Sequence, residues 1–69
     1  MTITGSQLIH ILERQGFVIQ RQKGSHVRLK GPDGQHITIP VHGSRALPTG
    51  TLLSILREVG LSIRDIEDK

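Results

Sequence analysis

Residues 26–41 constrain the fold more than any other part of the chain, because polar and apolar side chains alternate on both sides of a turn signal. Residues 26–30 and 36–41 each place an apolar residue at every second position. This alternation is typical of a strand with one buried and one exposed face. Residues 31–34, Gly-Pro-Asp-Gly, lie between the two runs and favour a hairpin. The segment therefore predicts two antiparallel strands that share a buried face.

The turn also predicts a register between these two strands. If residues 32–34 form a three-residue loop, Gly31 pairs with Gln35. Pro40 has no amide hydrogen to donate, which places the second strand at an edge of the sheet near its end. The remaining opposed pairs are Lys30 with His36, Arg28 with Thr38, and His26 with Pro40.

A helix and a further strand are predicted before the hairpin. Thr4 and Gln7 fit a capping box for a helix over residues 5–15, in which apolar residues recur at helical spacing. Gly16 is a natural end for this helix. Residues 17–22 are rich in strand-forming side chains, and a turn signal occupies the three residues that follow.

A second helix is predicted after the hairpin. Residues 43–48 predict a loop, Thr49 can cap the helix, and Gly60 can end it. Leu56 lies in the middle of its apolar stripe and is expected in the core. Ser62, with Asp65 three residues on, can cap one more short helical turn around Ile63 and Ile66.

The order of elements predicts an α+β fold, α-β-β-β-α, with two helices on one face of a three-stranded antiparallel sheet. The chain length corresponds to a single domain over residues 1–69. The covered face is expected to carry Val27, Leu29, Ile37, Ile39 and Val41. The open face is expected to carry His26, Arg28, Lys30, His36 and Thr38.

The charge distribution indicates a surface that faces a polyanion. The net charge is +3, but residues 14–57 alone carry +6, with Asp33 as their only acid. Such a basic segment is typical of a nucleic-acid surface, although solvated Arg and Lys side chains also keep a protein soluble. Phe17 is the only aromatic residue, so bases cannot be stacked on several exposed rings. A bound RNA would be held by its phosphates, its 2′-hydroxyls and its shape.

Composition argues against several other classes of protein. The absence of cysteine excludes disulfides and thiolate zinc sites, and the histidines form no metal-binding spacing, so we expect no metal and no small-molecule cofactor. No segment resembles a membrane span or a secretory signal, and we expect a cytoplasmic protein without a membrane partner.

His26 is the residue with the strongest case for chemistry. It follows Gly24 and Ser25 at the start of a strand and shares a face with Arg28. An imidazole has an ordinary pKa of about 6.5 and can move a proton at neutral pH, while nearby cations such as Lys23 would stabilise charge on a phosphodiester. These groups suffice to cut RNA through attack by its own 2′-hydroxyl. From spacing alone, a surface histidine on a polar strand remains the simpler interpretation.

The other candidate groups are weaker. His42 would be a diagonal neighbour of His26 if strand pairing continued, which makes it the candidate for a second acid or base. His36 would lie roughly 13 Å from His26 by strand rise and is better suited to contact a phosphate. No base is visible that would activate Ser25 as a nucleophile. His10, on the first helix, is expected at the boundary or in solvent.

Several short motifs occur along nearly the whole chain. They are Gly16-Phe17, Arg21-Gln22, Gly24-Ser25-His26, Pro40-Val41-His42, Gly50-Thr51-Leu52, Ile55-Leu56-Arg57 and Gly60-Leu61-Ser62. Taken together and in this order, they resemble the HicA (YcfA-like) family of bacterial toxins.

The resemblance implies a fold like that of double-stranded-RNA-binding domains and a toxin–antitoxin role as an mRNA interferase. It implies ribosome-independent mRNA cleavage without a metal, with His26 as the catalytic histidine, and a cognate HicB-type antitoxin that covers the active face. Lys23, Gly24, Ser25, Arg28 and Lys30 are then the expected RNA- and phosphate-binding residues.

Two other functions remain open from the sequence. The chain could be an RNA-binding module of the same fold that does not cut RNA, because only His26 is a convincing catalytic group. It could also be an interaction subunit whose basic face exists only to meet an acidic partner.

Overall fold

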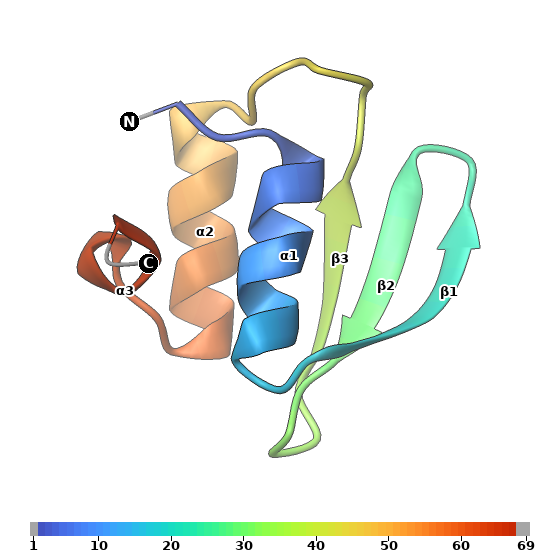
Figure 1. Ribbon diagram of the computed structural model, residues 1–69, viewed down its shortest axis with the longest axis vertical. Helices are drawn as coiled ribbons and strands as arrows, with labels where there is room; N and C mark the ends of the chain where they lie inside the picture. The colour runs from blue at the N-terminus through green and yellow to red at the C-terminus, as the bar shows by residue number, and fades with distance from the viewer. Residues whose placement is uncertain (1, 68–69) are drawn as a thin grey trace.

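The computed structural model describes residues 2–67 and has the predicted order of elements (Figure 1). The helices are α1 (Gly5–Arg14), α2 (Thr49–Val59) and α3 (Ile63–Glu67). The strands are β1 (Val18–Lys23), β2 (His26–Lys30) and β3 (His36–Pro40), which form one antiparallel sheet in the order β1-β2-β3. The α+β prediction, an α-β-β-β-α fold of the double-stranded-RNA-binding-domain type, is confirmed.

The predicted hairpin register is confirmed residue by residue. Lys30 lies opposite His36, Arg28 opposite Thr38, and His26 opposite Pro40. The loop closes through the bond from the Gly31 amide to the Gln35 carbonyl, at 2.7 Å, and Gly34 takes a φ of +85° that favours glycine. The three-residue loop therefore forms as the sequence predicts.

A single cluster of buried hydrophobic side chains fills the space between the sheet and the helices. Both α1 and α2 contact β3, and Figure 1 shows α3 beside α2, away from the sheet. The apolar residues of β2 and β3 are buried as predicted, except that Val41 lies one residue beyond β3 and is only half-buried. The cluster comprises Ile3, Leu8, Ile9, Ile11, Leu12, Phe17, Val27, Leu29, Ile37, Ile39, Leu47, Leu52, Ile55, Leu56, Val59 and Ile66.

The capping predictions are confirmed at two helices and wrong at the third. Thr4 and Gln7 form the capping box of α1, and the Ser62 amide donates to the Asp65 carboxylate at the start of α3, at 2.7 Å. Thr49 does not cap α2, because it is already the first helical residue. Pro48 precedes it without a side-chain cap, and its carbonyl accepts the first helical bond, from Leu52 at 2.9 Å.

The predicted strand at residues 17–22 is displaced by one residue. Phe17 lies outside β1 and is buried, whereas Lys23, expected in the turn, is the last residue of the strand. The Phe17 amide donates to the Leu12 carbonyl at 3.0 Å, so Phe17 packs against the end of α1 rather than pairing with β2.

The start of α1 packs closely against the end of β3. A Cβ atom at Gly5 would overlap the carbonyl oxygen of Pro40. The residues just before α1 also bond the loop after β3, through the Leu47 amide and the Ile3 carbonyl at 2.7 Å. Glycine at position 5 therefore allows the helix to sit at the end of the sheet where β2 begins.

Candidate active site

The exposed side of the sheet carries four cations. On β2, His26, Arg28 and Lys30 are exposed and alternate with two buried residues, so they share this side. Arg21 and Lys23 of β1 lie opposite Arg28 and His26. None of the three strands contains an acidic residue. We call the group Arg21, Lys23, His26, Arg28 and Lys30 the basic face.

Arg21 is a member of this face that the sequence does not reveal. Strict pairing from Val18 would place Gln20 opposite Arg28 and turn Arg21 to the other side of the sheet. The register instead shifts between Ile19 and Arg21, which leaves Gln20 as the extra residue of a β-bulge. The bulge therefore adds a fourth cation to the basic face.

Arg21 and Arg28 are like charges at directly opposed positions. Such pairs destabilise a sheet because the side chains on one face lie about 5 Å apart at Cβ. Lys23 and Lys30 extend the positive charge along the same side. A bound anion would relieve this repulsion, so the arrangement favours a polyanionic ligand.

His26 lies at the first position of β2, directly after the turn that joins it to β1. Gly24, the first turn residue, has a φ of +59°, and a two-residue hairpin with glycine there fits a type II′ turn. The imidazole is exposed, and among residues 2–67 it makes no hydrogen bond or ion pair. It is free to contact a ligand, and nothing in the described part of the chain orients it.

Pro40 is the direct neighbour of His26 on β3. The Val41 amide donates to the Ser25 carbonyl (2.6 Å), and the Gly31 amide donates to the Gln35 carbonyl (2.7 Å). These two bonds mark the hydrogen-bonded positions of the β2–β3 pair. His26 and Pro40 therefore form a non-hydrogen-bonded pair, in which opposed side chains lie closer together. The backbone nitrogen of Pro40 carries no hydrogen, but it points away from β2. The proline therefore removes no hydrogen bond between β2 and β3.

Ser25 and His42 flank this position, and neither side chain makes a hydrogen bond to His26 in the described part of the chain. Ser25 is half-buried, and its carbonyl accepts from Val41. His42 is exposed and lies two residues beyond β3, in a turn closed by its carbonyl and the Arg45 amide at 3.1 Å. Strand pairing ends before His42, so the register does not fix the direction of its side chain.

The remaining histidines lie farther from His26. His36 faces Lys30 at the far end of the β2–β3 pair. His10 is on α1, with a side chain 75% exposed and 3.6 Å from the Glu13 carboxylate. Within residues 2–67, no three His, Asp or Glu side chains cluster in a way that could hold a metal ion.

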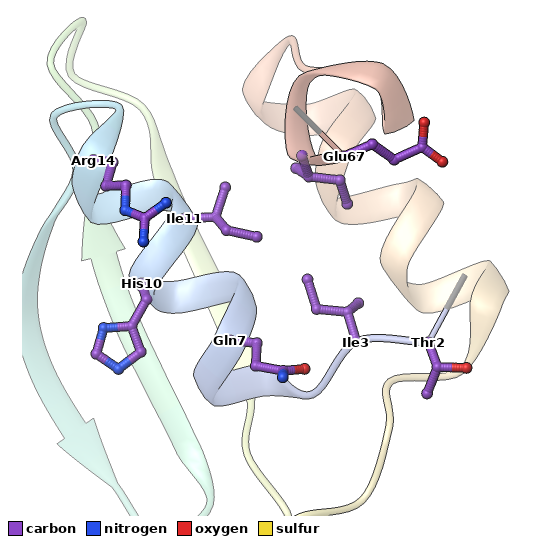
Figure 2. A pocket seen from close by; sticks show the side chains of 8 residues that line it. Thr2, Ile3, Gln7, His10, Ile11, Arg14 and Glu67 are labelled. Carbon is purple, nitrogen blue, oxygen red and sulfur yellow. The ribbon is translucent and has the colours of Figure 1, made fainter. Parts of the chain in front are cut away.

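One hollow in the molecule is remote from the basic face. It has a volume of about 460 Å³ and lies between α1 and α3 (Figure 2). Figure 2 shows Ile3 and Ile11 facing into it, while the imidazole of His10 projects away. No residue of the basic face lines it.

The fold and the basic face define a small α+β protein of the double-stranded-RNA-binding-domain type with a cationic, uncovered sheet. A family model described as the HicA toxin of bacterial toxin–antitoxin systems matches residues 5–61. The chain therefore belongs to the HicA toxin family, whose members act as toxins opposed by an antitoxin. No curated protein matches the chain. None of the helices within residues 2–67 is long and apolar enough to cross a membrane.

Proposed function

We propose that this toxin is a ribosome-independent endoribonuclease that cleaves mRNA in the cytoplasm, with His26 as its catalytic residue. The observation that supports the proposal best is the position of His26, exposed at the start of β2 and opposite Lys23 on the basic face. An unburied imidazole beside cations can reach a phosphodiester that those cations bind.

The reaction we propose uses the 2′-hydroxyl of the RNA as nucleophile. Its oxygen forms a bond to phosphorus, the bond from phosphorus to the 5′-oxygen breaks, and the products are a 2′,3′-cyclic phosphate and a 5′-hydroxyl. His26 accepts the proton from the 2′-hydroxyl or donates one to the 5′-oxygen. His42 is our candidate for the second proton transfer. This route uses no metal ion.

Lys23, Arg28 and Lys30 would bind phosphates on either side of the cut, together with Arg21. Gly24 has open space around its α-carbon, so a phosphate can approach the turn amides of Gly24 and Ser25. Phe17, the single residue among Phe, Tyr and Trp in the chain, is buried and cannot stack on a base. Backbone contacts would therefore dominate, and RNA affinity should fall steeply with salt.

The cognate antitoxin, which we propose to be of the HicB type, would block cleavage by covering the basic face. Complementary acidic groups on the antitoxin would speed capture. Because RNA and antitoxin would compete for Arg21 and Arg28, excess antitoxin should displace bound RNA.

The decisive experiment compares His26→Ala with the wild-type protein on a defined RNA. Wild type should give 2′,3′-cyclic phosphate ends in the presence of EDTA, and His26→Ala should give none. His10→Ala is the matched control, since His10 is an exposed histidine outside the face. Equal cleavage by His26→Ala would remove His26 from the mechanism, and 5′-phosphate ends would contradict 2′-hydroxyl attack.

A second candidate function is RNA binding without cleavage. It is favoured by the lack of any hydrogen-bonding partner for the His26 imidazole within residues 2–67. This candidate predicts salt-sensitive binding and intact RNA after long incubation. Time-dependent cleavage that disappears in His26→Ala would exclude it.

A further inference from the structure

A second hollow joins the basic face to α2. Its volume is about 330 Å³, at the lower end of the range for ligand sites, about 300–1,000 Å³. Ile37 of β3 and Ile55 of α2 provide apolar surface, and both are otherwise buried. We call this hollow the Glu58 groove; its polar lining residues are Arg28, His36, Thr38 and Glu58.

Glu58 is unexpected at the margin of a cationic surface. It is exposed in the last turn of α2, and among residues 2–67 no basic nitrogen lies within 4.0 Å of its carboxylate. A free carboxylate repels phosphate, so it does not help to hold an RNA backbone. An ionised carboxylate accepts hydrogen bonds and donates none, which suits it to an amino group.

We propose that the Glu58 groove binds a nucleobase that flanks the cleaved phosphate, and that Glu58 selects bases carrying an exocyclic amino group. The inference rests on the proposed RNA function and names the residue that sets base preference. The amino groups of cytosine (N4), adenine (N6) and guanine (N2) can donate to a carboxylate, and uracil is the one RNA base without such a group. Uracil presents a carbonyl oxygen at the position of the cytosine amino group. This oxygen and the Glu58 carboxylate are both hydrogen-bond acceptors, so they repel each other.

Arg28 connects the groove to the cleavage site. It belongs to the basic face and also lines the groove. Along β2 it lies two residues from His26, about 7 Å by strand rise. A strand whose phosphate contacts Arg28 can therefore place its neighbouring base against Ile37 and Ile55. Thr38, directly opposite Arg28, supplies a hydroxyl to the same base.

The test uses a pool of short RNAs randomised around the cleavage site, with base frequencies read from the product ends. Wild type should favour amino-bearing bases over uracil at one flanking position by roughly tenfold, the discrimination typical of one good base contact. Glu58→Gln should lose most of this preference, because an amide both donates and accepts. Glu67→Gln is the matched control, since it removes the same charge from α3, outside the groove.

A binding arm separates this inference from the proposed function. The same pool is captured on His26→Ala and on His26→Ala/Glu58→Gln, and the retained RNAs are sequenced. A preference for amino-bearing bases that depends on Glu58 supports the inference even if the wild-type protein cuts nothing. Cleavage without a Glu58-dependent preference overturns the inference and leaves the nuclease intact. A uniform gain in binding, equal in Glu58→Gln and Glu67→Gln, would reflect net charge alone and also overturns it.

Discussion

Arg21 of β1 and Arg28 of β2 face each other on the uncovered side of the sheet, brought into register by the bulge at Gln20. The pair concentrates positive charge two residues along each strand from Lys23 and His26. Sheet stability alone would disfavour this pairing, because opposed like charges repel. We interpret the arginine pair as a phosphate-binding feature. The pair should therefore lower the stability of the sheet and raise the affinity for RNA.

Replacing Arg21 tests that interpretation directly. We expect Arg21→Gln to raise the midpoint of urea unfolding at low salt, with the gain disappearing at high salt because screening already weakens the repulsion. RNA affinity should fall, and the slope of log affinity against log salt should shrink by about 0.7 to 1. Arg64→Gln, an arginine of α3 away from the sheet, should change neither quantity. Unchanged RNA binding by Arg21→Gln would exclude Arg21 from the interface.

The turn before His26 should be sensitive to a single methyl group. Gly24→Ala forces alanine to a φ of +59° with open space around it, so the cost is backbone strain of about 1–2 kcal/mol. Gly60→Ala meets the same situation at a φ of +75° after α2. Thermal or urea unfolding should show similar losses for both variants, while only Gly24→Ala should weaken RNA cleavage. Equal cleavage by the two variants would show that the turn does not approach the substrate.

The small core should depend strongly on Leu56. This side chain is 2% exposed in α2, whereas Leu53 on the same helix is 41% exposed. We expect Leu56→Ala to lower the free energy of unfolding by roughly 2–5 kcal/mol, through lost burial and the cavity left behind. Leu53→Ala should cost far less. Urea denaturation measures both, and a loss below about 0.5 kcal/mol for Leu56→Ala would contradict its place in the core.

Two helical glycines should respond oppositely to alanine. At Gly5 the added Cβ would overlap the Pro40 carbonyl, so Gly5→Ala must push α1 away from β3 and destabilise the protein. At Gly50, in the first turn of α2, nothing lies within 4 Å of an added Cβ. Gly50→Ala should therefore stabilise by roughly 0.5–1 kcal/mol. Calorimetric melting temperatures should move in opposite directions, and a gain for Gly5→Ala would refute the close contact.

The β2–β3 hairpin could be predicted in detail because its information is local. Strict alternation sets which residues are buried, and the three-residue loop sets the register of His26 against Pro40. The capping box at Thr4 and the bond from the Ser62 amide to the Asp65 carboxylate are local in the same sense. For these elements, the turn and the side-chain period leave no competing arrangement.

The features that the sequence could not predict depend on distant contacts. If alternation continued without a break from Val18, Arg21 would face the helices. The pairing of β1 with β2 shows a bulge, which places Arg21 on the exposed side of the sheet instead. Thr49 satisfies the usual rules for a cap, yet the chain enters the helix one residue earlier, at Pro48. Glu58 reaches the groove because α2 packs on β3, a tertiary contact that no short motif encodes.

The position of Pro40 also affects how the sheet ends. The backbone groups of Pro40 point outward from β3, so the missing hydrogen-bond donor lies on the free edge of that strand. The opposite free edge, on β1, is interrupted by the extra residue Gln20. Natural sheets use prolines and bulges at their margins to discourage other chains from adding a strand and aggregating. In this protein both edge strands carry such a feature, which discourages the edges of the uncovered sheet from pairing with strands of other molecules.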